Sequence, residues 1–196
     1  YMEIYRESIL HVESDILLTK DFPVSKFCNF KYELAYPVVA LNRGVASTVY
    51  IANSKSASRF VKYATESCLR NPLATDMEIL ANFALQNESY VHQLAFSPLG
   101  KSSFHALNFP PGLSALSQSL EYFGGIFDGN DLGVYLFGFD PRNTKAISYI
   151  GTSIPGNYAN IQEWKMKYDD SRLFVSVLDS GILIPVFSLH ATSKNP

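Results

Sequence analysis

Short apolar segments alternate with helical segments along this chain, and this alternation constrains its fold more than any other feature. Strands are expected at 9–12, 48–52, 90–96, 174–178 and 182–189, and helices at 57–69, from 75 onward and at 113–123. Strands interleaved with helices favour an α/β fold. With 196 residues, the chain suits a single domain covering 1–196.

The clearest local signal is the start of the helix after Thr75. A capping box pairs a Ser or Thr before the first turn with a Glu or Gln three residues later, and Thr75 and Glu78 have this spacing. The preceding helix, 57–69, has Ser54 or Ser56 as its expected cap and is broken by Asn71-Pro72. Both helices are therefore predicted with defined ends.

Composition excludes several classes of protein. Hydrophobic residues make up 47% of the chain, too many for a disordered segment. The net charge is −2 and no stretch concentrates Lys and Arg, so a nucleic-acid partner is not expected. The longest apolar stretches, Val134–Phe139 and Gly181–Leu189, are far shorter than the ~20 residues of a membrane span. Cys28 and Cys68 can form one disulfide or remain two buried thiols, and we favour the thiols.

Two carboxylates follow the first strand directly. Ile9–Val12 is expected to be a buried strand, and it ends at Glu13-Ser14-Asp15. Side chains two residues apart in extended chain project to the same side, so Glu13 and Asp15 can share one hard divalent cation. A solvated turn would have the same composition, and further ligands are needed to favour a metal.

Four segments, in this order, resemble the A-type-fold glycosyltransferases, and in particular their glycogenin-like members. The segments are His11-Val12-Glu13-Ser14-Asp15, Asn42-Arg43-Gly44-Val45-Ala46-Ser47-Thr48, Thr75-Asp76-Met77-Glu78-Ile79-Leu80 and Leu189-His190-Ala191-Thr192-Ser193-Lys194-Asn195. The first is similar to the family's Asp-x-Asp motif, with Glu13 in place of the first Asp. The last is similar to a final strand that supplies a metal-binding His and a Lys for the diphosphate.

The resemblance implies a mixed sheet flanked by helices, incomplete at its N-terminus because the family's first strands would precede the chain. It implies that Glu13, Asp15 and His190 hold Mn²⁺ or Mg²⁺ and that Lys194 neutralises a diphosphate. Asn42 and Gly44 would bind the donor sugar. The implied activity is transfer of a sugar from a nucleoside diphosphate sugar to a hydroxyl of a glycan or protein.

Acidic residues elsewhere are candidates for contact with the acceptor. Asp76 opens a helix, while Asp128 and Asp131 lie in one short loop and Asp140 with Arg142 in another. A carboxylate within hydrogen-bond reach can orient or deprotonate an acceptor hydroxyl, and Arg142 can pair with phosphate. Each acid also has an ordinary reading, as a turn former or as a favourable charge at a helix N-terminus.

Other readings remain open for several of these residues. His11 is expected to be a core histidine rather than a ligand, Asn42 and Gly44 suit a tight turn, and His190 lies close enough to the C-terminus to fray. The chain could also be a non-catalytic relative of these enzymes.

A different class of protein is the second alternative. The Trp164-x-x-x-Tyr168 block resembles autoinducer-binding domains of LuxR-type regulators, where aromatic side chains would line an apolar pocket. The spacing of Asp15 and His190 distinguishes the two functions, because a shared metal requires them within ~5 Å of each other.

Overall fold

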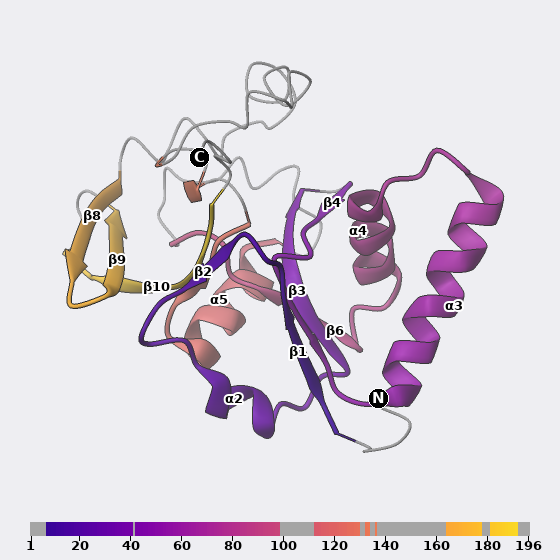
Figure 1. The fold of residues 1–196 in the computed structure, drawn as a ribbon, viewed down its shortest axis with the longest axis horizontal. Coiled ribbons are helices and arrows are strands. Elements are labelled where there is room, and N and C mark those ends of the chain that lie inside the picture. The colour runs from indigo at the N-terminus through magenta and orange to yellow at the C-terminus, as the bar shows by residue number, and fades with distance from the viewer. Residues whose placement is uncertain are drawn as a thin grey trace.

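The computed structural model describes residues 7–40, 42–98, 112–129, 132, 133, 136, 164–177 and 181–191. These residues form an α/β structure with two sheets (Figure 1). The first sheet contains β1 (Ile9–Val12), β3 (Leu34–Ala40), β4 (Arg43–Gly44), β5 (Thr48–Ile51) and β6 (Val91–Leu94). The second contains β2 (Ile16–Leu18), β7 (Ile126–Phe127), β8 (Trp164–Asp169), β9 (Arg172–Val177) and β10 (Ile184–His190).

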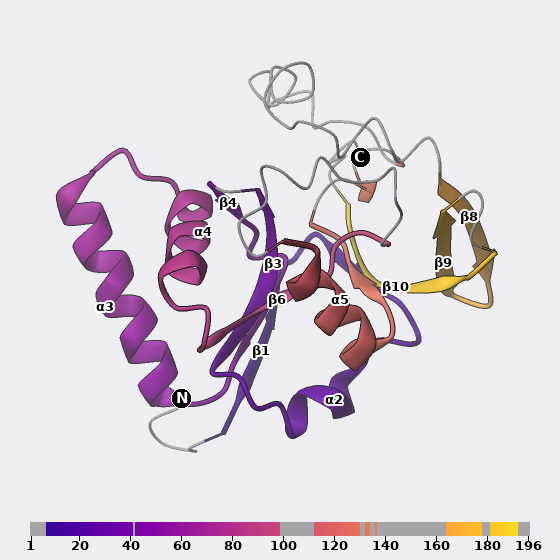
Figure 2. The same cartoon turned by 180° about the vertical axis from the view of Figure 1, so that it is seen from behind.

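The first sheet is mixed, as expected. Its strand order is β1-β5-β3-β4, with antiparallel pairs throughout, and β6 adds a parallel pair to β3. The helices α3 (Ser54–Arg70) and α4 (Asp76–Gln86) lie on one side of this sheet (Figure 2). The helices α2 (Val24–Cys28) and α5 (Gly112–Phe123) lie on the other. The prediction of a mixed sheet flanked by helices is therefore confirmed.

The second sheet was not anticipated. It has the order β2-β10-β9-β8 with antiparallel neighbours, and the short β7 pairs parallel with β10. Buried residues of both sheets belong to one hydrophobic cluster, which includes Leu34 and Val38 from the first and Val186 and Leu189 from the second. The two sheets are thus joined through a shared core.

Helix boundaries follow local chemistry. Thr75 caps α4, and its side chain and that of Glu78 make the reciprocal hydrogen bonds of a capping box, as predicted. The cap of α3 is Asn53, whose side chain accepts from the Ser56 N–H, rather than either serine. Among the described residues, none of the helices combines the length and apolar character needed to cross a bilayer.

Three expectations about burial are wrong. β1 is an edge strand paired with β5 alone, so it is only partly covered, and His11 is exposed rather than in the core. Cys28 and Cys68 are exposed free thiols, because both lie on the outer faces of their helices.

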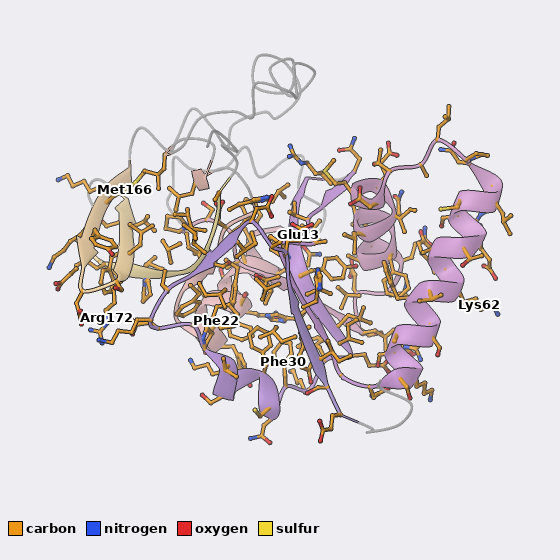
Figure 3. The ribbon with its side chains drawn as sticks, viewed as in Figure 1. Glu13, Phe22, Phe30, Lys62, Met166 and Arg172 are labelled. Atoms are coloured by element: carbon orange, nitrogen blue, oxygen red, sulfur yellow. The ribbon has the colours of Figure 1, made fainter. Side chains whose placement is uncertain are left out.

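Aromatic residues hold α2 and α5 against the first sheet. The cluster includes Phe27, Phe30, Tyr50, Phe123 and Phe127. Ring centroids of Phe27 and Phe123 are 4.8 Å apart, which joins the two helices directly. Figure 3 shows Phe22 and Phe30 on the side of the molecule where α2 and the sheet meet.

His92 in β6 is buried at the margin of this cluster. It is 5% exposed, with its ring 4.8 Å from that of Tyr32 and 5.0 Å from that of Phe30. Burial, together with the nearby positive charge of Lys31, lowers the pKa of His92 from 6.5 to about 4. The folded protein therefore holds this imidazole neutral at pH values where the unfolded chain protonates it.

This arrangement predicts a loss of stability in mild acid. A His with a depressed folded-state pKa costs stability as pH falls from about 6.5 to about 4. At about 1.4 kcal/mol per pKa unit, the full effect is roughly 3 kcal/mol. Urea unfolding at about pH 7 and pH 4 should show wild type losing that much more free energy of unfolding than His92→Gln. Equal losses in the two proteins would refute the assignment.

Candidate metal centre

The segment Glu13-Ser14-Asp15 forms the turn by which the chain passes from the first sheet to the second. β1 ends at Val12 and β2 begins at Ile16, so the two carboxylates lie where the sheets meet. Backbone hydrogen bonds hold this turn: the Glu13 N–H donates to the Ser47 carbonyl (3.3 Å), and the Ile16 N–H donates to the Glu13 carbonyl (3.2 Å). Figure 3 shows Glu13 where β1 passes into β2.

His190 reaches the same turn from the other end of the sequence. It is the last residue of β10, which pairs antiparallel with β2 so that His190 lies opposite Ile16. The next N–H, that of Ala191, donates to the Asp15 carbonyl at 2.7 Å. Sheet pairing therefore ties His190 down, and the reading of it as a frayed terminal residue does not hold.

The three side chains converge. One ligand atom from each of Glu13, Asp15 and His190 lies within 4.8 Å of the other two. His190 Nε2 and Asp15 Oδ2 are 3.4 Å apart, and their side chains are 16% and 25% exposed. The spacing meets the requirement of a shared ion, and all three residues are partly exposed. Carboxylates with an imidazole suit Mn²⁺ or Mg²⁺, although the same geometry also suits an Asp15–His190 ion pair.

Asp128 lies beneath this group rather than beside it. Its side chain is buried, and its carboxylate accepts hydrogen bonds from the N–H groups of Leu132, Gly133 and His190. Burial raises the pKa of Asp128, while these three hydrogen bonds and the adjacent His190 oppose the rise. Direct contact with an acceptor, the role expected from sequence, does not fit this burial.

The other described candidates do not join the group. Asn42 is exposed in the turn between β3 and β4, as a turn residue would be. Gly44 is buried against α4, where a Cβ would lie 2.5 Å from that of Leu80, so close packing explains this glycine better than sugar contact. Asp76 is exposed in the first turn of α4, where its charge is favourable at the helix N-terminus.

Four predicted site residues lie outside the described residues: Asp131, Asp140, Arg142 and Lys194. Their roles stay predictions.

The regulator alternative expects Trp164 and Tyr168 to line an apolar pocket. Tyr168 is 73% exposed on β8, which does not fit this role, and the Trp164 side chain lies outside the described set. The described pocket, of about 250 Å³, is lined mainly by polar side chains, including Tyr32, Glu88 and Gln118. By contrast, the separation of Asp15 and His190 is within the limit set for the metal alternative.

Sequence reasoning missed the buried hydroxyls next to the group. Ser47, Thr48 and Ser188 are each 0% exposed, and all three lie where β5 and β10 approach Asp128. Ser47 and Thr48 end the second motif segment, but a Ser-Thr pair at the start of a strand also suits an ordinary turn, and no local signal indicates their contacts with Asp128 and Ser188.

Searches with this chain against protein-family models, curated proteins and solved structures found no match, so the candidate site is interpreted from its geometry and from the motif resemblance.

Proposed function

We propose that Glu13, Asp15 and His190 bind a divalent cation, and that the protein uses it to transfer a sugar from a nucleoside diphosphate sugar to a hydroxyl acceptor. The observation that carries the metal part is the convergence of three ligand atoms within 4.8 Å from residues 175 positions apart in sequence (15 to 190). The sugar-transfer part rests on the resemblance of the four sequence motifs to A-type-fold glycosyltransferases.

The residues present suit this role. Two carboxylates and an imidazole offer three ligand atoms, and an octahedral ion would keep further positions for water or phosphate oxygens. A bound cation would stabilise the negative charge that develops on a diphosphate leaving group. In this proposal the protein holds the cation beside the diphosphate, and Lys194 supplies a second positive charge there. The motif resemblance assigns Asn42 and Asp76 to contact with the donor or the acceptor.

Binding of the cation alone can be tested without any nucleotide. Calorimetric titration of the metal-free protein with Mn²⁺ should show one site. Asp15→Asn removes the negative charge of one ligand and His190→Ala removes a ligand atom, so each should weaken Mn²⁺ binding by at least about 10-fold. Asp21→Asn is the matched control, since Asp21 is also a paired acid, 3.2 Å from the Arg172 guanidinium, but lies outside the group. Equal affinity in wild type and Asp15→Asn would remove the metal from the proposal.

Nucleotide binding tests the sugar-transfer part of the proposal. With Mn²⁺ present, the full-length protein should bind UDP or GDP and release it when EDTA is added, because the ion bridges protein and diphosphate. His190→Ala should lose nucleotide binding and turnover of the corresponding nucleotide sugar together. If Mn²⁺ binds but neither nucleotide does, the result supports the cation site and contradicts the sugar-transfer proposal.

A further inference from the structure

The carboxylate of Asp128 holds the backbone of His190. Its Oδ2 accepts the His190 N–H at 3.0 Å and the Gly133 N–H at 2.8 Å, while its Oδ1 accepts the Leu132 N–H at 3.1 Å. The side chain is 1% exposed. A buried carboxylate is costly unless hydrogen bonds satisfy it, and here every one of these bonds comes from a backbone N–H.

Ser47 continues this connection to Glu13. The Ser47 hydroxyl donates to the Asp128 carbonyl at 3.0 Å, and the Ser47 carbonyl accepts the Glu13 N–H at 3.3 Å. Ser47 is 0% exposed, so water does not compete for these bonds. Two residues, Ser47 and Asp128, therefore link the peptide that carries Glu13 in the first sheet to the peptide that carries His190 in the second.

Packing limits the freedom of His190 from a second direction. Gly133 lies so close to the His190 carbonyl that a Cβ at this position would collide with it. Nearby, the Asp128 N–H donates to the Ser188 carbonyl at 3.1 Å, which adds a bond between residue 128 and β10. The end of β10 is thus held on both its N–H and its carbonyl side.

We propose that Ser47 and Asp128 are positioning residues that set the spacing of Glu13, Asp15 and His190. This inference rests on the proposed cation site for its functional meaning. The Asp128 carboxylate bonds the His190 peptide directly, and the Ser47 hydroxyl acts on it through the Asp128 carbonyl, so losing these bonds should displace the ligand atoms rather than only weaken the fold. Outer groups that orient metal ligands typically contribute 10- to 100-fold to metal affinity.

The test uses graded variants of both residues. Ser47→Ala removes the hydroxyl bond to Asp128, and Asp128→Ala removes all three carboxylate bonds. In Asp128→Asn the amide oxygen can still accept the N–H groups of Gly133 and His190, so this variant should keep a higher affinity for Mn²⁺ than Asp128→Ala. Ser119→Ala is the matched control, because Ser119 is also 0% exposed and its Oγ accepts the Ala95 N–H at 2.9 Å, away from Glu13 and His190.

Each variant is titrated with Mn²⁺, and its metal-free crystal structure is determined. We expect Ser47→Ala and Asp128→Ala to bind Mn²⁺ about 10- to 100-fold more weakly, Asp128→Asn to fall between Asp128→Ala and wild type, and Ser119→Ala to match wild type. In the metal-free structures, the ligand atoms of Ser47→Ala should spread beyond their 4.8 Å spacing. Thermal unfolding identifies any variant that fails to fold, and Ser47→Ala, the mildest change, then decides the outcome.

The two readouts separate this inference from the proposed function. A wild type that binds no Mn²⁺ overturns the metal proposal, whereas the metal-free structures still decide whether Ser47 and Asp128 set the spacing. Ligand atoms that keep their wild-type spacing in Ser47→Ala and Asp128→Asn would overturn the positioning role. Displaced ligand atoms would support it whatever the metal titration shows.

Discussion

The antiparallel pairing of β2 with β10 is the interaction on which the candidate site depends. β2 follows the acidic turn directly and β10 ends at His190, so a register that places His190 opposite Ile16 also brings its imidazole to Asp15. A shift by one residue would point His190 to the other face of the sheet. The bond from the Ala191 N–H to the Asp15 carbonyl fixes the register at the site itself.

Because of this pairing, two carboxylates and an imidazole lie together at the boundary between the two sheets. The acidic turn connects the two sheets, because β1 precedes it in the first sheet and β2 follows it in the second. At this boundary, Ser47 and Asp128 add buried hydrogen bonds to the apolar packing and the backbone hydrogen bonds that join the two sheets. Buried polar contacts have stricter geometry than apolar ones, and satisfied networks of this kind rigidify their surroundings. A site for an ion needs that rigidity, since ligand distances must hold within a few tenths of an ångström.

The sequence was most informative where structure depends on near neighbours. The capping box at Thr75 and Glu78, the end of the first strand at Glu13 and the strand leading to His190 could all be read from local patterns. The exposure of His11 could not be predicted in this way, because it depends on β1 having only one neighbour in the sheet. The second sheet and the role of Asp128 were also beyond local reading, since both require contacts between residues more than 60 positions apart. The grouping of Glu13, Asp15 and His190 was expected from a resemblance to known enzymes rather than from spacing alone.

Anomalous diffraction from a crystal soaked in Mn²⁺ tests the central claim most directly, because it locates the ion without assuming its ligands. We expect one strong peak among the carboxylate oxygens of Glu13 and Asp15 and the Nε2 of His190, at distances of about 2.0–2.3 Å. A crystal that shows a direct Asp15–His190 contact and no peak between them would contradict it, and the pair would then be an ion pair of structural importance alone.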